Sequence, residues 1–429
     1  MRARAKVARL DAGRRSLSPQ RGPKGKGPLV RLAPRAQPRS LAGATVLQLA
    51  PGLSDDPAGH AAIDIALTLI QSGARAIVAG PGGPLVDELH GFGAEWIPMP
   101  NDGFNPLRIG VNASRIARLI AGERVDIVHA QSAGAAWSAL AATHKQPVFT
   151  VTSFPDRLPS DFWPATYFAG ALARGDRVIA PSSYVSRVMI DRYRIPAARI
   201  TVIPRAVDTA TFNPAAIDPD RVIALRRIWG VLSHMNVVLV PGRIAPWNGQ
   251  MSMVDAAALI ARAGKRNIVF VFAGEDRTHY NYACALRDRA AQHGVDASCR
   301  FVGHCADMPA ALAAADVVVV PALKPPLSGR AVAEAQAVGR PVVTTAIGML
   351  PENVLAPPRM RDELRTGWVV RPGHAGELAA AVGAALALDA TAHEALGARA
   401  RQFAEFMFSP RSVAEAIRGV YTSLLARDA

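Results

Sequence analysis

Short apolar runs alternate with helix-patterned segments along almost the whole chain. "ATVLQLA" begins at Ala44, and in the next segment Ile63, Leu67 and Ile70 recur at helical spacing. "ARAIVAG", "VDIVHA", "PVFTVT" and "DRVIAPS" continue the pattern, with helical segments between them. Buried strands that alternate with helices form parallel sheets covered on both faces. The alternation therefore predicts an α/β fold with doubly wound sheets.

The alternation restarts in the second half of the chain. "NVVLVPG", "NIVFVFAG", "DVVVVPA" and "RPVVTT" are its strand candidates, and "TGWVVRPG" ends the sheet. Between the halves, Pro204, Pro214 and Pro219 punctuate a loop over residues 204–220. We expect two Rossmann-like domains, residues 41–204 and 205–409, followed by a helix over 410–429 that packs back towards the first domain. No short-period repeat indicates a solenoid.

The net charge of +15 is concentrated at the start of the chain. Residues 1–40 hold twelve Lys or Arg and one acid, Asp11, so this tail carries +11 and the other 389 residues share +4. Its composition predicts disorder. The interpretations left open are a floppy extension (an over-extended start site included), attraction to anionic lipid head groups and an organelle transit peptide. No interleaved aromatic residues support nucleic-acid binding.

Composition excludes several classes of protein. Half of the residues are hydrophobic, which rules out wholesale disorder, and no apolar run reaches the roughly 18 residues that span a bilayer. Three cysteines, Cys284, Cys299 and Cys305, form neither a disulfide framework nor a zinc pattern, so we expect buried thiols in a reducing cytosol. The chain lacks a GxGxxG fingerprint and a GxxxxGK[ST] loop, which argues against a nicotinamide dehydrogenase and a P-loop NTPase.

Ligands of open α/β sheets bind beyond the carboxyl ends of the strands, so two such domains place a site in the cleft between them. The motifs at these ends are recognisable. "VLVPGRIAPWNGQ", "FVGHCADMPAALAAADVVVVPA", "GRAVAEAQAVGRPVVT" and "TGWVVRPG" follow in order, after "GHAAIDIALTLIQSGARAIVAGPGG", "VDIVHAQS", "RVIAPSS" and "VIPRAVD". Over roughly residues 44–425 the chain resembles the family 4 retaining glycosyltransferases, which have the two-Rossmann GT-B fold. It is most similar to bacterial members that add sugars to cell-envelope glycolipids such as lipopolysaccharide.

The resemblance implies a nucleoside diphosphate sugar as donor, a cell-envelope glycolipid or polysaccharide as acceptor, and no metal or cofactor. Such proteins aim an Arg, a Lys and helix N-terminal amides at the diphosphate. Arg243, Asn248 and Gly249 fall at the diphosphate positions, and Glu334 falls at the Glu that accepts hydrogen bonds from the ribose hydroxyls. Further candidates around the cleft complete the expected site: Lys324, Gly329, Arg330, Gly348 and Glu352. No catalytic residue is assigned. We expect a cytoplasmic protein. Of the interpretations left open for the basic tail, attraction to lipid head groups would place it at the inner face of the membrane.

Several functional positions depart from the family's pattern. Asn248 stands where the family has Lys, and Pro326 where it has the Glu that holds the donor sugar. Other departures lie in the first domain. Asp56 and Pro57 stand where the family has a Gly-Gly loop after the first strand, and Pro155 stands near the position of the family's His after the fifth strand. Gln131 and Ala133 stand where the nearest relatives have Arg. Two hypotheses follow, a glycosyltransferase with a modified donor site in which Lys324 replaces the lost cation, or a catalytically impaired binding or regulatory protein. Other two-Rossmann enzymes, such as epimerases or phosphorylases, remain open.

Overall fold

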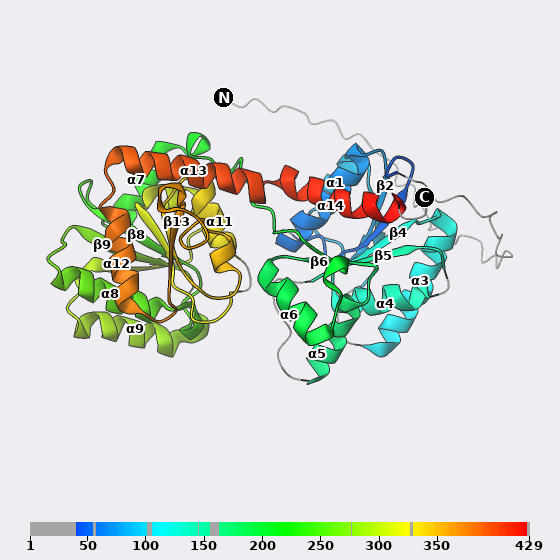
Figure 1. Ribbon diagram of the computed structural model, residues 1–429, viewed down its shortest axis with the longest axis horizontal. Helices are drawn as coiled ribbons and strands as arrows, with labels where there is room; N and C mark the ends of the chain where they lie inside the picture. Colours follow the sequence, from blue (N-terminus) through cyan, green and yellow to red (C-terminus); the bar gives the residue numbers. More distant parts are fainter. Residues whose placement is uncertain are drawn as a thin grey trace, which may run out of the picture. The chain divides into compact units, whose positions relative to one another are not determined.

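The structure is a computed structural model that describes residues 40–54, 57–100, 105–144, 146–154, 163–275, 277–326 and 329–426. It contains two parallel sheets with helices between successive strands (Figure 1). The basic tail, Asp56 and Pro155 lie outside the described residues, as does the side chain of Pro57. The expectation of two doubly wound sheets is confirmed by the strand order of each.

The first sheet has seven strands in the order β3-β2-β1-β4-β5-β6-β7. Its strands are β1 Thr45–Leu49, β2 Arg75–Gly80, β3 Glu95–Pro98, β4 Ile127–Ala130, β5 Phe149–Ser153, β6 Arg177–Ala180 and β7 Ile200–Val202. The connecting helices are α1 Pro57–Gln71, α2 Val86–Gly91, α3 Pro106–Glu123, α4 Ala133–Thr143, α5 Trp163–Ala169, the 3-10 turn η1 Gly170–Ala173 and α6 Ser183–Tyr193. The strand order reverses between β1 and β4, the point where doubly wound folds bind ligands.

The second sheet has six strands in the order β10-β9-β8-β11-β12-β13. Its strands are β8 Asn236–Pro241, β9 Ile268–Ala273, β10 Cys299–Gly303, β11 Val317–Val320, β12 Val342–Thr345 and β13 Gly367–Val370. The helices of this part are α7 Pro219–Ile228, α8 Gln250–Arg262, α9 Tyr280–Gln292, α10 Met308–Ala314, α11 Arg330–Ala337, α12 Ala375–Leu386 and α13 Ala390–Phe408. Here the order reverses between β8 and β11.

Side-chain caps fix where several helices begin. The Ser182 hydroxyl accepts a hydrogen bond from the backbone N–H of Val185 (3.1 Å) at the start of α6. Asn105 caps α3 by accepting from the N–H of Leu107 (2.9 Å), and Pro106 follows as the first helical residue. These caps hold the helix starts at the carboxyl edge of the sheet, because each helix follows the end of a strand.

Each sheet is packed between two apolar layers. Residues of α1, α2 and α14 (Pro410–Leu425) form one cluster on the first sheet, and residues of α3, α4, η1 and α6 form a second cluster. The second sheet is covered by α8, α9 and α12 in one cluster, and by α7, α10, α11 and α13 in the other. We call residues 40–203 together with α14 the N-terminal half, and residues 204–408 the C-terminal half.

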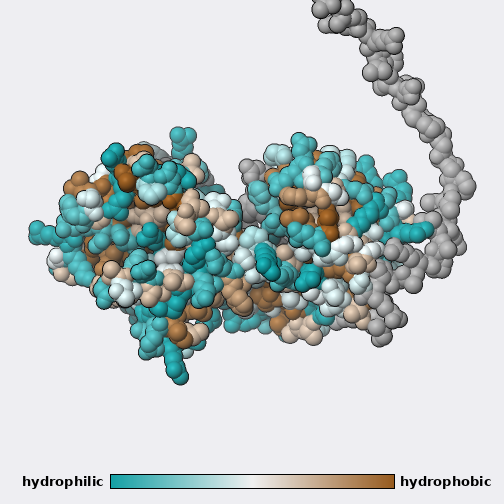
Figure 2. All heavy atoms as spheres, turned by 90° about the horizontal axis from the view of Figure 1, so that it is seen from above, coloured by the Kyte–Doolittle hydropathy of each residue, from teal (hydrophilic) through white to brown (hydrophobic). Residues whose placement is uncertain are grey.

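The last helix belongs to the core of the N-terminal half. Val413, Ile417, Tyr421 and Leu424 of α14 are buried in the same cluster as Leu41 and the inner face of α1. Hydrophilic and hydrophobic residues are interspersed over the side of the molecule seen in Figure 2. Within the described part of the chain, no single helix is long and apolar enough to span a membrane. The segments Ala375–Leu386 and Ala390–Leu425 pass that test only jointly, by length and composition, and the break between them bends by 109°.

Candidate functional site

The loop after β8 presents an unpaired cation. Asn248 Nδ2 and Gln250 Nε2 both donate hydrogen bonds to the carbonyl oxygen of Arg243, at 2.7 and 2.9 Å. These bonds fix the loop backbone and leave the exposed Arg243 guanidinium without a hydrogen bond or ion pair among the described residues. Asn248 therefore organises the loop. Its direct contact with a donor stays a prediction.

Gly249 lets this loop approach the end of β11. Its φ of 74° lies in the left-handed region, and a Cβ at this position would collide with the carbonyl oxygen of Pro321. The carbonyl oxygen of Trp247 accepts from the backbone N–H groups of Leu323 (2.8 Å) and Lys324 (3.3 Å). The loops that carry Arg243 and Lys324 are thereby joined at the point where the strand order reverses. Lys324 is exposed and forms no ion pair within the described residues.

Glu334 is a buried carboxylate on α11. Its side chain is 8% exposed and forms an ion pair with Nε of Arg330, one turn earlier. Burial raises the pKa of Glu334, and the charge of Arg330 and its hydrogen bond oppose that rise. One guanidinium does not occupy every lone pair of a carboxylate, so Glu334 retains acceptor capacity for a ligand hydroxyl.

The start of α11 is packed tightly against the loop after β12. A Cβ on Gly329 would collide with the side chain of Asn353, whose Nδ2 donates to the Gly329 carbonyl oxygen (3.2 Å). Gly348, with φ of 59°, packs against Pro325 in the same region. The structure thus brings Gly329, Arg330 and Glu334 together on α11, and joins the Gly348 loop to the segment that holds Lys324.

Glu352 has a different environment from Glu334. Its carboxylate accepts hydrogen bonds from the backbone N–H groups of Ser183 (2.7 Å) and Tyr184 (2.6 Å), at the first turn of α6. Arg187 lies 3.9 Å away. A helix N-terminus carries partial positive charge and binds carboxylates well. In this structure the Glu352 carboxylate therefore stabilises the start of α6, and a role in donor binding stays a prediction.

A cavity opens at the carboxyl edge of the first sheet, between α1 and α14. Most of its lining is apolar, and its polar side chains are Asp64, Gln131, Ser153 and Arg205. Gln131 Nε2 donates to Oε1 of the fully buried Gln48 (3.1 Å), and Nε2 of Gln48 has no hydrogen-bond partner among the described residues. Gln131 therefore lines the cavity, whereas Ala133 is the first residue of α4.

Asp64 is a cavity residue that the sequence analysis did not single out. Burial raises its pKa, the charge of His60 lowers it, and the nearby carboxylates of Glu88 and Asp208 raise it further. A half-buried carboxyl group with a raised pKa in a cavity is a candidate for ligand binding or proton transfer. Its signal in the sequence is a single acid within the apolar segment "HAAIDIALTLIQ".

A buried polar chain lies behind the cavity. Nδ1 of His129 is 2.7 Å from the hydroxyl of Tyr421, and Nε2 is 2.7 Å from Oγ of Ser153. His129 is fully buried, and burial, with a smaller contribution from the charge of Arg205, lowers its pKa to about 3. The imidazole is therefore neutral at ordinary pH and connects β4, the end of β5 and α14. The sequence analysis did not find this residue either.

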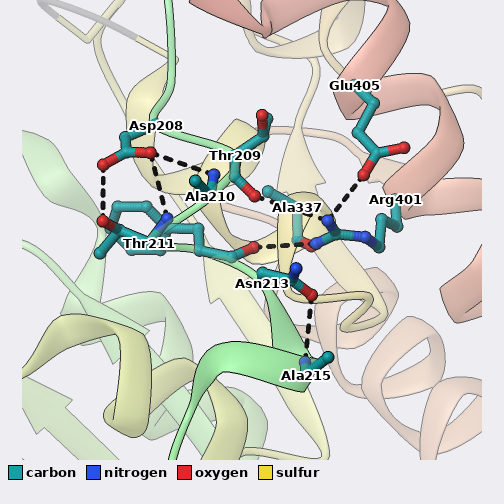
Figure 3. A network of polar contacts seen from close by, with 10 residues as sticks. Asp208, Thr209, Ala210, Thr211, Asn213, Ala215, Ala337, Arg401 and Glu405 are labelled. Atoms are coloured by element: carbon teal, nitrogen blue, oxygen red, sulfur yellow. Dashed lines mark hydrogen bonds and ion pairs between the residues drawn. The ribbon is translucent and has the colours of Figure 1, made fainter.

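The segment between the halves is held by Arg401 of α13. Its guanidinium donates to the carbonyl oxygens of Phe212 (3.1 Å) and Ala337 (2.6 Å), and Glu405 pairs with it at 2.6 Å. Asp208 begins this segment, and its carboxylate accepts from the N–H of Ala210 and the hydroxyl of Thr211 (Figure 3). The joint is thus an ordered turn anchored on α13.

A second hollow adjoins the cavity at this joint. Gly329, Arg330, Ala333 and Asn353 line it from the C-terminal half, together with Pro204 and Arg205 of the joint. Pro204 and Arg205 also line the first cavity. The cleft candidates Gly329 and Arg330 and the N-terminal cavity therefore share a wall formed by Pro204 and Arg205. In the described ranges, no group of three or more His, Cys, Asp or Glu side chains is placed to hold a metal ion.

Both halves match sequence profiles of known families. Residues 58–211 match Glycosyltransferase Family 4, and residues 235–387 match Glycosyl transferases group 1. The chain therefore contains a Glycosyltransferase Family 4 domain followed by a Glycosyl transferases group 1 domain. The resemblance inferred from the motifs is thereby confirmed.

Individual relatives agree with this assignment. The D-inositol 3-phosphate glycosyltransferase of Salinispora arenicola is 34% identical over 186 residues, which cover 42% of this chain and 41% of that protein. The chain spans about half the length of the curated relatives it matches, with 41%, 53% and 40% of the first three covered.

Among solved structures, a glycosyltransferase from Rickettsia africae is 25% identical with a TM-score of 0.75, over 90% of this chain and 99% of that one. Anabaena Alr3699/HepE, solved in complex with UDP, has a TM-score of 0.71 and 21% identity, over 89% of this chain and 100% of that one. These likenesses confirm the GT-B fold.

Proposed function

We propose that this protein is a retaining glycosyltransferase that moves a sugar from a nucleoside diphosphate sugar to a cell-envelope glycolipid or polysaccharide. The observation that carries the proposal is the pairing of two features in the C-terminal half. An unpaired Arg243 stands on a loop that Gly249 holds against β11, and a buried carboxylate, Glu334, stands on α11. A cation and a carboxylate suit the two ends of a nucleoside diphosphate, its phosphates and its ribose hydroxyls.

The diphosphate would be bound without a metal ion. Its negative charge grows as the glycosidic bond breaks, so groups that stabilise the leaving diphosphate lower the barrier. Arg243, the N-terminus of α8 and Lys324 are the positive groups available on the two joined loops. In this proposal Lys324 supplies the charge that Asn248 lacks.

The acceptor would occupy the cavity of the N-terminal half. Gln131 and Ser153 offer hydrogen-bonding groups to sugar hydroxyls, and Asp64 offers a carboxyl group. Relatives support this class of reaction: three solved complexes of Alr3699/HepE contain UDP, UDP with glucose, or UDP-glucose, and WaaG, a neighbour in fold, is involved in lipopolysaccharide biosynthesis. Relatives in sequence include D-inositol 3-phosphate glycosyltransferases.

A catalytically impaired binding protein is the second candidate. Two observations favour it: Asn248 and Pro326 carry no charge at positions where the family has Lys and Glu, and the Glu352 carboxylate is engaged at the start of α6. Such a protein would retain nucleotide affinity without turnover.

The deciding experiment measures binding and turnover separately. Titration calorimetry with UDP, GDP and ADP reports whether a nucleotide site exists. Hydrolysis and transfer are then followed with UDP-, GDP- and ADP-sugars and a lipid-containing acceptor extract. Binding together with transfer above background supports the transferase. Binding with hydrolysis and transfer both at background supports the impaired protein, and no binding of any nucleotide refutes both.

The double change Asn248→Lys and Pro326→Glu sharpens the distinction. A charge-assisted hydrogen bond to a phosphate contributes about 1.5–3 kcal/mol, so the new Lys should raise diphosphate affinity about tenfold or more. In an active transferase, turnover should rise or stay high. In an impaired protein, affinity should rise while turnover stays at background.

A further inference from the structure

A groove follows the outer seam between α1 and α14, which lie side by side (Figure 1). Its volume is about 480 Å³, within the usual range for ligand sites. One face of each helix lines it, because the lining residues recur three, four and seven positions apart. They are Asp64, Leu67, Thr68 and Gln71 of α1, Ser72 just after it, and Pro410, Arg411, Ala414, Glu415 and Arg418 of α14. We call this feature the α1–α14 groove.

The α1–α14 groove adjoins the acceptor cavity. Asp64 and Ala414, one residue from each helix, line both hollows. The cavity in turn adjoins the hollow of the C-terminal half at Pro204 and Arg205, and Arg330 lines that hollow at the start of α11. Three hollows therefore follow one another from α11 to the outer surface of the N-terminal half. An acceptor longer than one sugar would find room beyond the cavity.

The charges of the α1–α14 groove are balanced. Two acidic side chains, Asp64 and Glu415, and two basic ones, Arg411 and Arg418, line it. Arg411 pairs with Glu415 at 3.3 Å, whereas Arg418 forms no ion pair among the described residues. An anion or a cation would meet as many repelling as attracting groups, so the lining favours a neutral ligand. For the same reason the groove does not suit the basic tail, which carries +11.

Uncharged hydrogen-bonding groups lie between these charges. The hydroxyl of Thr68 donates to the carbonyl oxygen of Asp64 (2.7 Å), and that of Ser72 donates to the carbonyl oxygen of Thr68 (2.8 Å). Both hydroxyl oxygens therefore keep acceptor capacity, and the exposed amide of Gln71 both donates and accepts. Sugar hydroxyls also donate and accept, so they match this lining. Among the described residues, no aromatic side chain lines the groove to stack a nucleobase.

We infer that the α1–α14 groove binds the distal sugar units of an uncharged oligosaccharide acceptor whose reacting end lies in the acceptor cavity. The inference rests on the proposed transferase and deepens it, since it names an oligosaccharide chain as the part of the acceptor that the protein recognises. Each sugar that reaches the groove gains hydrogen bonds there. Affinity therefore rises with the length of the acceptor until the groove is filled.

The test measures oligosaccharide binding without nucleotide, by titration calorimetry on the full-length protein. The probes are oligosaccharides released from bacterial lipopolysaccharide, dephosphorylated and separated into a short and a long fraction. Methyl glucoside, methyl galactoside and methyl mannoside are the single-sugar probes. The long fraction is expected to bind about tenfold or more tightly than any single sugar, because two or more additional hydrogen bonds form in the groove.

Two variants address the groove itself. Gln71→Trp fills it with a larger side chain and is expected to weaken binding of the long fraction about tenfold while single-sugar binding stays unchanged. The matched control is Gln292→Trp, because Gln71 and Gln292 are both exposed and each is the last residue of its helix.

Arg418→Ala removes a charged donor from the groove and should also weaken the long fraction about tenfold. Its control is Arg262→Ala, at the exposed last residue of α8. Thermal melting confirms that each variant is folded.

The inference is overturned if the long fraction does not bind, if it binds no more tightly than single sugars, or if target and control variants bind it equally. Tighter binding of the long fraction before dephosphorylation, lost in Gln71→Trp, would overturn the neutral ligand. Transfer to the acceptor extract is measured separately. Groove-dependent binding without transfer keeps the groove and refutes the transferase, whereas transfer without any preference for length keeps the transferase and refutes the groove.

Discussion

The two halves of the molecule carry different chemistry at the carboxyl edges of similar sheets. In the C-terminal half, Arg243 and Lys324 form no ion pairs among the described residues, and Gly249 holds their loops together. In the N-terminal half, the corresponding edge is a largely apolar cavity in front of a neutral His129. The C-terminal edge thus offers positive charge to an anion, whereas the N-terminal edge offers a largely apolar lining with a few polar side chains, among them Asp64 and Arg205.

The two sites also differ in what gives them their shape. The C-terminal site depends largely on backbone groups, namely the left-handed Gly249 and the carbonyl oxygen of Arg243, which accepts from the side chain of Asn248. The N-terminal site depends on side chains such as Gln131, Asp64 and Ser153. A change there alters the ligand itself.

The largest expected effect tests the backbone of the C-terminal half. Gly249→Ala adds a Cβ that collides with Pro321, so we expect a loss of about 3 kcal/mol or more in the free energy of unfolding, with loss of nucleotide binding. The control is Gly264→Ala, which has nearly the same φ (77° against 74°) but open space around it, and should lose about 1–2 kcal/mol. Urea denaturation measures the free energy of unfolding of both variants. Equal losses would show that the contact between residue 249 and Pro321 does not contribute to the effect.

The second effect concerns the two carboxylates of the C-terminal half. Glu334→Gln should weaken nucleotide binding by about 1.5–3 kcal/mol, because a charged acceptor for ribose is lost. Glu352→Gln should change it less, since that carboxylate binds the start of α6. Calorimetric titration with UDP, GDP and ADP measures both. Negligible effects of both changes would mean that neither carboxylate belongs to a nucleotide site.

The third effect moves to the N-terminal half. Tyr421→Phe removes the hydroxyl that meets Nδ1 of His129 and leaves a buried polar group unsatisfied, at a cost of about 1–3 kcal/mol in the free energy of unfolding. Tyr193→Phe, whose hydroxyl donates to the carbonyl oxygen of Thr166 at 3.2 Å in a less buried place, should cost about 0.5–1.5 kcal/mol. Denaturation curves of the two variants at pH 7 provide the comparison, and a larger loss for Tyr193→Phe would contradict it.

The fourth effect is a pH dependence confined to the N-terminal half. Unfolded His129 takes up a proton near pH 6.5, whereas burial keeps its folded pKa at about 3, so acid favours the unfolded chain. Between pH 6 and pH 4, the free energy of unfolding of the wild type should fall more steeply than that of His129→Gln, by about 1.4 kcal/mol per pH unit. The exposed His144→Gln on the same half is the control. Parallel curves for wild type and His129→Gln would show that the histidine is not buried neutral.

The smallest expected effect lies outside both halves. A chain that begins at Leu41, a buried residue of the first core cluster, should keep the melting temperature of the full chain, because a highly charged tail without apolar period adds no core. Differential scanning calorimetry compares the two, and a drop of several degrees would show that the tail is part of the fold.

Local patterns were sufficient to predict most elements. The apolar run "DVVVVPA" contains β11, and the segment where Ile63, Leu67 and Ile70 recur at helical spacing is α1. α5 was missed, because "WPATYFA" has no apolar period and is too short to build one. α7 was missed because its first residue, Pro219, resembles the loop prolines before it.

The residues of the candidate site also divide into those that a local motif predicts and those that only the folded structure brings together. Arg243, Asn248 and Gly249 were predicted together because a contiguous motif carries them, and the structure places them in one loop. The contact of His129 with Tyr421 joins residues 292 positions apart, and no local spacing encodes it. Asp64 was visible as an acid in an apolar helix, but its cavity exists only once α1 and α14 are packed.

The packing of α14 against α1 also determines when the N-terminal half can finish folding during synthesis. Tyr421, Leu424 and Leu425 of α14 complete a core that begins at Leu41, so the core of the N-terminal half closes only after α14 has been made. Roughly 200 residues separate β7 from α14, a delay on the order of 10–40 s at bacterial and eukaryotic elongation rates. During that interval the flank beside α1 that α14 later covers exposes apolar side chains, and exposed apolar surface of this kind favours aggregation.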